Sequence, residues 1–431
     1  MFGLRRQHDR EEHPCLLSLF HTSWLPASMA KCIYLRGLQL NKMAFRKFRA
    51  TQLFDGYKLL KNDNVLVTTP GGEIVSIVAA DEAGADIEEL EGLLVPGLIN
   101  CHCHLELSHL KNVIPPHTGL VEFLCSVVTK RGFAAGLIQE EIEKAAKEMY
   151  NNGIAAVGDI CNTADAVKVK SESPIRWQSF IEVLSFTDAK AMENMAHYKT
   201  VLDTHNKTLP FPNSNVLTPH APYSISPKTF DLLNMVTEGK IISIHNQEHP
   251  AEDELYKTGG GDYLKLFKIF GVEKSPFPIT GKSSIRSYLP HFKNGQTIFL
   301  IHNTYMPQQD IAFANDYANE NGLKLVYCLC PNANLYIENK LPEIEKFIEF
   351  DCHMVLGTDS YSSNWQLSIA REIQTLHHQF PSLELETILQ WATSNGAKAL
   401  RWDNELGSFE KGKKPGVTLL ANDLNSSVRI I

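Results

Sequence analysis

The 431-residue sequence lacks several features that would assign it to other classes of protein. No apolar run approaches the roughly 18 residues needed to cross a bilayer. Acidic residues outnumber basic ones by 49 to 41, and no basic block or basic-aromatic stripe could follow a phosphate backbone. No Gly-x-Gly-x-x-Gly or P-loop motif is present for binding a dinucleotide or a nucleotide. We therefore expect neither a membrane nor a nucleic acid as a partner.

Cysteine is present, but its arrangement is unlike that of a secreted, disulfide-linked protein. The nine cysteines are scattered, and four of them form the Cys-x-Cys pairs Cys101/Cys103 and Cys328/Cys330 on expected strands. A reducing, cytoplasmic location fits this usage. Residues 1–42 mix charges and then continue as an interrupted apolar stretch, which is unlike a signal peptide. We expect this segment to be disordered or a non-native extension, with the fold beginning at Met43.

Both ends of the remaining chain have short, strand-like patterns. Residues 43–92 contain alternating runs around the turn Pro70-Gly71-Gly72, and residues 404–431 have the same character. These patterns predict a small β-sandwich domain formed by both chain ends.

Residues 93–403 alternate between apolar, β-rich runs and segments with helical spacing. Near-continuous apolar strands separated by helices indicate parallel strands covered by helices. Eight such units predict an α/β fold, a (β/α)8 TIM barrel whose active site lies at the C-terminal strand ends. An open, doubly wound sheet is the alternative. The expected strands are 93–105, 153–160, 177–186, 215–220, 241–246, 297–303, 324–330 and 353–359, and clear helical patterns occupy 137–152, 226–238, 307–322 and 367–380.

The segment Cys101-His102-Cys103-His104 places four candidate metal ligands in a row. Side chains alternate between the two faces of a strand, so the histidines share one face and the cysteines share the other. Glu106 continues the histidine register and would also face the barrel mouth, whereas buried cysteine packs as a small hydrophobe. The histidines are therefore expected to face the pocket and the cysteines to pack against helices.

Four other expected strands also finish with a polar residue that can bind a metal or move a proton. Because the C-terminal ends of barrel strands meet at one mouth, these residues and the histidine pair predict a single site. The four residues are His220, His245, His302 and Asp359.

The segments VPGLINCHCHLE, HAPYS, HNQE and GTDS occur in this order and resemble the signature of the amidohydrolase superfamily. The resemblance runs from about residue 45 to the C-terminus. Within the superfamily, the sequence resembles the branch of cytosine deaminases and chlorohydrolases (ATZ/TRZ-like). The segment HLELSHLKNVIPPHTGLVEFL is similar to that of aminodeoxyfutalosine deaminases of menaquinone synthesis.

The resemblance implies a cofactor of one divalent metal ion, Zn(II) or Fe(II). Members with two ions use a carboxylated lysine or an acidic residue on strand 3 or 4. Strand 4 here ends in His220, and Glu182 on strand 3 lies mid-strand, where we expect a structural role. The implied ligands are His102, His104, His245 and Asp359.

The resemblance also implies the roles of the catalytic residues. Asp359 would be the general base toward a water molecule whose pKa the ion lowers. Glu248 would deliver a proton to the ring nitrogen of the substrate, and His302 would hydrogen-bond the attacking hydroxide or the developing oxyanion. The residues expected to face the substrate are Glu106, His220, Asn334 and Ser360.

The resulting hypothesis is a metal-dependent deaminase of a purine-like or related N-heterocyclic small molecule. Its most specific candidate substrate is 6-aminodeoxyfutalosine. One alternative is a hydrolase that acts on a cyclic amide, an imidazolone or a triazine, because the scaffold alone does not fix the reaction. A non-catalytic relative that keeps the barrel is the other alternative, and assembly as a homodimer is left open.

Overall fold

Eight parallel strands lie at the centre of the computed structural model, which describes residues 45–61, 63–209 and 215–431. They form two four-stranded sheets, with the strand orders β6-β7-β8-β9 and β10-β11-β12-β13. The segment expected to be an extension, residues 1–42, lies outside the described residues. The strands are β6 (Leu98–Cys103), β7 (Ile154–Cys161), β8 (Arg176–Val183), β9 (Val216–Pro219), β10 (Ile241–Asn246), β11 (Thr297–His302), β12 (Lys324–Leu329) and β13 (Met354–Leu356).

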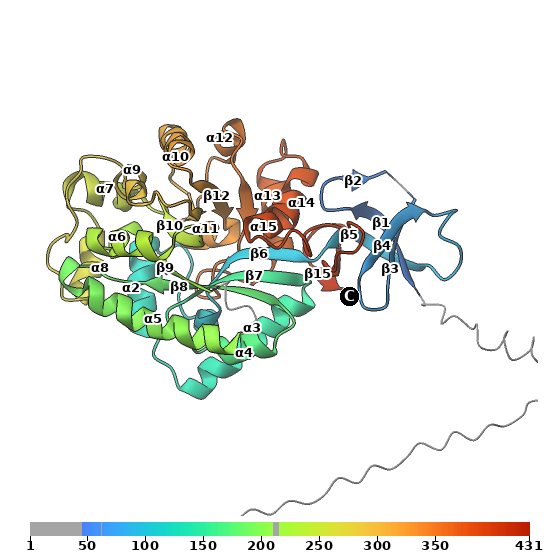
Figure 1. Cartoon of the computed structure of the whole chain (residues 1–431), viewed down its shortest axis with the longest axis horizontal. Helices are drawn as coiled ribbons and strands as arrows, with labels where there is room; N and C mark the ends of the chain where they lie inside the picture. Colours follow the sequence, from blue (N-terminus) through green and yellow to red (C-terminus); the bar gives the residue numbers. More distant parts are fainter. Residues whose placement is uncertain (1–44, 62, 210–214) are drawn as a thin grey trace, which may run out of the picture. The chain divides into compact units, whose positions relative to one another are not determined.

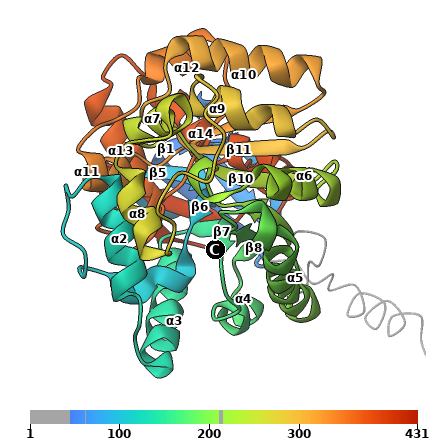
Figure 2. The same cartoon turned by 90° about the vertical axis from the view of Figure 1, so that its left-hand side faces the viewer.

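Helices follow the strands and surround them, as the view of Figure 2 shows. Figure 1 shows α3 and α5 along the β6–β9 sheet, where they contact β7 and β8. No helix within the described ranges is long and apolar enough to span a membrane. The helices are α2 (Leu120–Lys130), α3 (Ala135–Asn151), α4 (Val167–Glu172), α5 (Ala191–Thr208), α6 (Pro227–Val236), α7 (Pro250–Thr258), α8 (Tyr263–Ile269), α9 (Ser284–Tyr288), α10 (Gln308–Glu320), α11 (Pro331–Glu338), α12 (Ile344–Glu349), α13 (Ile369–Gln379), α14 (Leu385–Ala392) and α15 (Ser394–Ala399), with 3-10 turns at η1 (Leu105–Leu110), η2 (Asp188–Lys190), η4 (Pro222–Ser224) and η5 (Leu289–His291).

All four helical patterns expected from the sequence are helices, namely α3, α6, α10 and α13. Helix α6 shows the local reason most clearly. The Ser226 side chain accepts a hydrogen bond from the backbone N–H of Thr229, and Pro227 occupies the first helical turn. A hydroxyl cap followed by proline is a typical helix start. The hydroxyl accepts a hydrogen bond from a backbone N–H that has no acceptor within the helix, and proline has no N–H to leave unpaired.

The two four-stranded sheets meet between β9 and β10. The backbone N–H of His245 donates to the carbonyl of His220 over 3.0 Å. Just before this contact, β9 ends at Pro219, which has no N–H to continue a hydrogen-bonded ladder. The hydroxyl of Thr218 instead accepts from the backbone N–H of Ser243 at 2.7 Å.

The sheets also meet between β13 and β6. The backbone N–H groups of Thr358 and Asp359 both donate to the carbonyl of His102, each over 3.0 Å. Gly357 permits this approach, because a Cβ at that position would lie 2.7 Å from the Cβ of His102. The backbone that carries Asp359 is thereby fixed against the strand that carries the histidine pair.

Both chain ends contribute to a separate seven-stranded sheet with the order β15-β14-β5-β1-β3-β4 and β2 paired to β1. The single strand expected at 93–105 is wrong, because β5 ends at Pro96 and β6 begins at Leu98. Gly97 lies between the two strands. A larger residue would not fit there, because a Cβ at this position would lie 2.2 Å from the carbonyl oxygen of Pro415. The strands are β1 (Arg46–Phe54), β2 (Leu59–Leu60), β3 (Asn64–Thr68), β4 (Ile74–Ala79), β5 (Glu88–Pro96), β14 (Val417–Leu420) and β15 (Ser427–Arg429).

A fully buried ion pair supports the first strands of the parallel core. Lys170 of α4 lies with its Nζ 2.5 Å from Oδ2 of Asp159 on β7, and both side chains are 0% exposed. The other carboxylate oxygen of Asp159 accepts a hydrogen bond from the backbone N–H of Leu105, at 2.8 Å. The pair therefore holds the chain immediately after His104.

We expect Lys170→Met to lower the free energy of unfolding by about 3–5 kcal/mol, because it leaves a buried carboxylate without its cation. Urea denaturation followed by circular dichroism measures this loss. Lys168→Met on the same helix is the control, because Lys168 is exposed and should change stability little. Equal stability of the two variants would contradict the structural role of the pair.

Candidate active site

His102 and His104 lie at the C-terminal end of β6, with their ring centroids 4.9 Å apart. The ring of His102 also lies 5.1 Å from that of His245 on β10. Cys101 is buried on the other side of the strand, where its Sγ would lie 3.0 Å from a Cβ placed on Gly396 of α15. Cys101 and Cys103 are both free thiols in the hydrophobic core. The structure therefore separates the histidines from the cysteines, as the strand period predicts.

Asp359 joins the histidines from the loop after β13. Its Oδ1 lies 3.5 Å from Nε2 of His102 and 3.4 Å from Nε2 of His104. Potential ligand atoms of His102, His104 and His245 lie within 4.8 Å of one another, as do those of His102, His302 and Asp359. The arrangement therefore brings imidazole nitrogens and one carboxylate to a common point.

Hydrogen bonds outside this cluster orient two of its members. Nδ1 of His245 donates to the carbonyl oxygen of His220 over 2.8 Å, which leaves Nε2 with a free lone pair. The hydroxyl of Ser363 donates to Oδ2 of Asp359 over 2.6 Å, so that Oδ1 is the oxygen turned toward the histidines. These contacts set which atom of each side chain can bind a ligand.

Backbone strain also accompanies the cluster. Asp359 has φ of 59° and His302 has φ of 70°, in a region that residues other than glycine rarely adopt. Each such residue costs on the order of 1–3 kcal/mol, and strained residues of this kind concentrate at functional sites. The surrounding hydrogen bonds hold both residues in positions that the free chain would disfavour.

The electrostatics of the cluster keep His104, His245 and His302 neutral and the aspartate ionised. Burial lowers the pKa of His104 to about 3 and the pKa of His302 to about 4. Burial also lowers the pKa of His245 well below its ordinary value. Although burial alone would raise the pKa of Asp359, the rings of His102, His104 and His302 beside its carboxylate bring that pKa well below normal.

His102 provides a direct test of whether these residues suit a metal ion. Its side chain is completely buried, and neither ring nitrogen has a hydrogen-bond partner among the described residues. Buried polar atoms are nearly always satisfied, so an unpaired imidazole indicates a missing partner. Neutral imidazoles and a carboxylate are ligands that Zn(II) and Fe(II) both accept. The residues therefore fit a divalent metal ion.

Glu248 and His302 stand beside this cluster. Oε1 of Glu248 lies 3.6 Å from Nε2 of His302. Burial, assisted by the negative charge of Asp359, raises the pKa of Glu248 well above its ordinary value, which favours the protonated form of this carboxyl. Nδ1 of His302 donates to Oδ1 of Asn334 over 2.9 Å, which leaves Nε2 as an acceptor facing Glu248.

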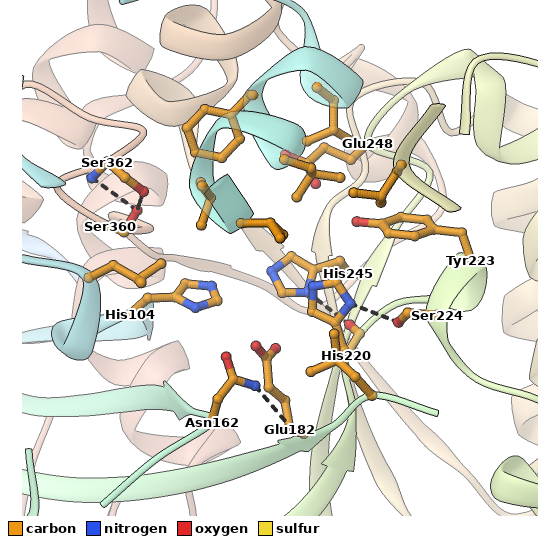
Figure 3. A pocket seen from close by; sticks show the side chains of 18 of the residues that line it. His104, Asn162, Glu182, His220, Tyr223, Ser224, His245, Glu248, Ser360 and Ser362 are labelled. Atoms are coloured by element: carbon orange, nitrogen blue, oxygen red, sulfur yellow. Dashed lines mark hydrogen bonds between the residues drawn. The ribbon is translucent and has the colours of Figure 1, made fainter. Parts of the chain in front are cut away.

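A cavity of about 800 Å³, counted with its open mouth, adjoins these groups. Figure 3 shows His104, His220, His245 and Glu248 around it. The other polar side chains on its wall include His302, Asp359 and Ser360. The opposite wall is apolar, built mainly from α2 and the end of α8: Leu120, Phe123, Leu124, Val127, Val128, Leu266 and Phe270.

The residues of this cluster lie within a sequence region that matches a known protein family. The model of the amidohydrolase family matches residues 93–429, which include every side chain of the cluster. The chain belongs to the amidohydrolase family. The family model covers the eight parallel strands and the residues that end them.

Curated proteins with similar sequences include an adenosine deaminase of Helicobacter pylori, 28% identical over 76% of this chain and 78% of that protein. An aminodeoxyfutalosine deaminase of Nitratiruptor sp. is 25% identical, over 76% of this chain and 78% of the relative. Among solved structures, the aminofutalosine deaminase of Helicobacter pylori in complex with methylthio-coformycin superposes with a TM-score of 0.71 at 23% identity. That match covers 90% of this chain and all of the other.

Two residues of this amidohydrolase lie elsewhere than the sequence predicts. Glu106 does not line the cavity: it lies in η1, and its carboxylate accepts hydrogen bonds from the backbone N–H groups of Asn162 and Thr163, both at 3.0 Å. Arg131 lies 3.6 Å from the same carboxylate. Asn334 is turned toward His302 and is not part of the cavity wall. Glu106 thus holds the backbone at residues 162 and 163, and Asn334 orients the ring of His302, instead of contacting the cavity themselves.

Sequence reasoning missed or misassigned several polar residues of the amidohydrolase site, and Arg131, Ser224 and Ser362 on the cavity wall are among those it missed. Glu182 and Asn162 line the cavity, and Ser363 holds Asp359. The run of serines after Asp359, in GTDSYSSN, was the available signal for Ser363. Burial and the nearby charge of Glu106 raise the pKa of Glu182 to about 8. Because Glu182 lines the cavity, it belongs to the site and does not have the purely structural role expected from the sequence.

Proposed function

We propose that this amidohydrolase is a metal-dependent deaminase of an adenine nucleoside. The observation that carries the proposal is the position of Glu248, a buried carboxyl with a raised pKa that lies 3.6 Å from His302, beside the cluster of metal-type ligands. Hydrolysis of an amino group from an aromatic ring needs such an acid, because the neighbouring ring nitrogen gains a proton as the ring is attacked. The names of the similar adenosine and aminodeoxyfutalosine deaminases support the same reaction.

His102, His104, His245 and Asp359 would hold one divalent ion, Zn(II) or Fe(II). When bound, such an ion acts as a Lewis acid and lowers the pKa of water from 15.7 toward about 7. A second group of candidate ligands, Glu182, His220 and His245, shares His245 with the first. Since Nδ1 of His245 is already bonded to a carbonyl, its remaining nitrogen can serve only one ion. A single ion is therefore the better fit.

Asp359 and His302 would act on the attacking water. Asp359 is ionised and presents Oδ1 to the cluster, so this carboxylate can accept the proton of the water. His302 carries its proton on Nδ1, and its Nε2 can accept a hydrogen bond from the O–H of the nucleophile. The two residues thus orient the water from different strands and remove its proton.

Glu248 would then transfer its proton to the ring nitrogen next to the carbon that bears the amino group. Asp359 would pass the proton taken from the water to the amino group, which leaves as ammonia. The proton of the remaining hydroxyl on the attacked carbon would then return to the ionised Glu248 carboxylate as the ring carbonyl forms. The cycle consumes one water molecule and one amino group, and the acid ends protonated as it began. No other carboxyl on the described cavity wall lies as close to His302.

The substrate side of the cavity supports a nucleoside with an additional apolar group. His220 directs Nε2 to the cavity because its Nδ1 bonds to the hydroxyl of Ser224 over 2.8 Å, and Ser360 lies on the same wall. The apolar surface of α2 and α8 suits a substituent beyond the sugar. Because relatives bear its name, 6-aminodeoxyfutalosine remains the specific candidate.

We further infer that the eight parallel strands, β6 to β13, close into a (β/α)8 barrel that begins at Leu98, later than the expected boundary at residue 93, with both chain ends in a small β domain. The contacts between β9 and β10 and between β13 and β6 support closure on both sides. In a closed barrel, the C-terminal strand ends form one mouth. The seven cysteines within the described residues are free, which is consistent with a reducing compartment such as the cytoplasm.

Ammonia release from a panel of adenine nucleosides tests the proposed function. The panel contains adenosine, 5′-methylthioadenosine, S-adenosylhomocysteine and 6-aminodeoxyfutalosine. We expect turnover of at least one, loss of that activity after dialysis against a chelator, and recovery after addition of Zn(II) or Fe(II). Activity that survives complete metal removal contradicts the proposal, as does chloride release from a chlorotriazine without any nucleoside turnover.

A further inference from the structure

Glu182 is the acidic residue of the cavity that the reaction above does not use. It is the next-to-last residue of β8, and its side chain is only 4% exposed. Figure 3 shows its carboxyl directed from β8 toward the histidine rings, beside Asn162. The position lies at the C-terminal end of a parallel strand, where side chains meet bound ligands.

One carboxyl oxygen of Glu182 lacks a partner among the residues that the structure describes. Oε2 has no hydrogen-bond partner within the described part of the chain. The amide of Asn162 donates to the backbone carbonyl of Glu182, at 3.3 Å, and leaves that oxygen unpaired. Leaving a buried oxygen unpaired costs free energy, so such atoms in native sites usually have a partner from water, an ion or a ligand.

A metal ion is a poor candidate for that partner. The only cluster that includes Glu182 among the described residues also needs His220 and His245. His245 commits Nδ1 to the carbonyl of His220, and its other nitrogen belongs to the first site. One carboxylate and one imidazole would remain, fewer than the ligands of a stable protein metal site.

We propose that Glu182 binds hydroxyl groups of the substrate's sugar and thereby selects ribonucleosides. This inference rests on the proposed function. Adenine offers only its 6-amino group as an N–H donor, and that group must lie at the reacting centre beside Glu248. The remaining donors of an adenine nucleoside are sugar hydroxyls, and a carboxylate accepting from ribose hydroxyls is a familiar mode of nucleoside recognition.

The apolar wall supports this orientation. With the base held near Glu248 and His302, the rest of the nucleoside extends along the cavity between Glu182 and the helix α2. The side chains that α2 presents are Leu120, Phe123, Leu124, Val127 and Val128, which offer no partner for a hydroxyl. Glu182 and Asn162, together with Arg131 after α2, are polar side chains that line the same cavity, so the hydroxyl edge of the sugar would turn toward them.

Sugar analogues test the assignment in wild-type protein and in Glu182→Met, with Glu182→Gln as a conservative second variant. The substrates are adenosine and 5′-methylthioadenosine, each compared with its 2′-deoxy and 3′-deoxy analogue. We expect wild-type protein to prefer at least one hydroxylated substrate over its deoxy analogue by roughly 10- to 100-fold in kcat/KM. Glu182→Met should reduce this preference to within about threefold, by losing activity on the hydroxylated substrate and not on the analogue.

Metal content, measured on the same samples, should equal that of wild type in both variants. Glu172→Met is the matched control, because this acid is exposed on α4, lies off the cavity wall and should leave the activity on every sugar unchanged. If Glu182→Met does not fold, the test rests on Glu182→Gln. Full retention of the wild-type sugar preference in Glu182→Gln would then overturn the assignment.

Equal losses on all sugars in the Glu182 variants, or loss of the metal, overturn the assignment and leave the proposed function intact. A wild-type preference of less than about threefold does the same. Wild-type protein that releases ammonia from none of the four nucleosides of the panel used for the proposed function overturns that function and this inference with it.

Discussion

Replacement of Glu248 by glutamine is expected to lower kcat for deamination by about 10²- to 10⁴-fold, the range that a positioned general acid contributes. Glutamine keeps the shape of the side chain but has no proton to transfer to the ring nitrogen. KM should change much less, because the lost interaction acts in the transition state and not in the bound substrate. Steady-state ammonia release measures the change, and metal analysis of the same sample should give the wild-type content.

The control for this variant is Glu254→Gln on α7, the helix that follows Glu248. Glu254 is exposed and lies outside the cavity wall, so its variant should retain wild-type kinetics. A Glu248→Gln variant with full metal content and a kcat within about threefold of wild type would assign the proton transfer to another group. Loss of metal in the same variant would instead indicate that Glu248 acts on the ligand cluster.

The central strands could be predicted because their sequences are apolar on both faces and bounded by turn or helix signals. β10 and β11 are fully buried along their whole lengths, and both agree with the expected ranges to within one residue. β13 is shorter than expected, with only three residues. Beyond it, Asp359 adopts a positive φ, which strand propensity cannot reveal. The ends of strands, where the site forms, are thus harder to predict than the strands themselves.

Glu106 shows why the two-residue period failed just beyond the histidine pair. β6 ends at Cys103, and η1 begins at Leu105. In a 3-10 turn the side chains follow a period of three, so the strand register no longer applies. The partners of Glu106 are backbone N–H groups at positions 162 and 163, distant in sequence, and only the tertiary fold brings them together.

Glu182 and Asn334 were misread for a related reason. The apolar run that contains Glu182 continues to residue 186, so the sequence does not mark the end of β8 at Val183. Asn334 lies on α11, and its contact with His302 depends on how that helix packs over β11. In both cases a polar residue type indicated a functional position, but the sequence did not show where that residue lies relative to the end of a strand.

Alanine at His102 is expected to abolish metal binding and to lower kcat by at least about 10³-fold, since several kcal/mol of transition-state stabilisation depend on the ion. Neither ring nitrogen of His102 has a hydrogen-bond partner in the described structure, so a metal ion would be the polar partner of this buried ring. Metal analysis, ammonia release and thermal unfolding measure the three consequences. Added Zn(II) should raise the melting temperature of wild-type protein and not that of the variant.

Cys101→Ala is the matched control, because Cys101 precedes His102 on the same strand and faces the opposite way. Its Sγ packs near Gly396 in the core, so the variant should lose about 1–2 kcal/mol of stability. It should keep its metal and its activity. Metal retained by His102→Ala, or lost by Cys101→Ala, would reverse the roles that the strand alternation assigns. The expected pattern separates a functional face of β6 from a packing face at single-residue resolution, since the two substitutions differ by one position along the chain.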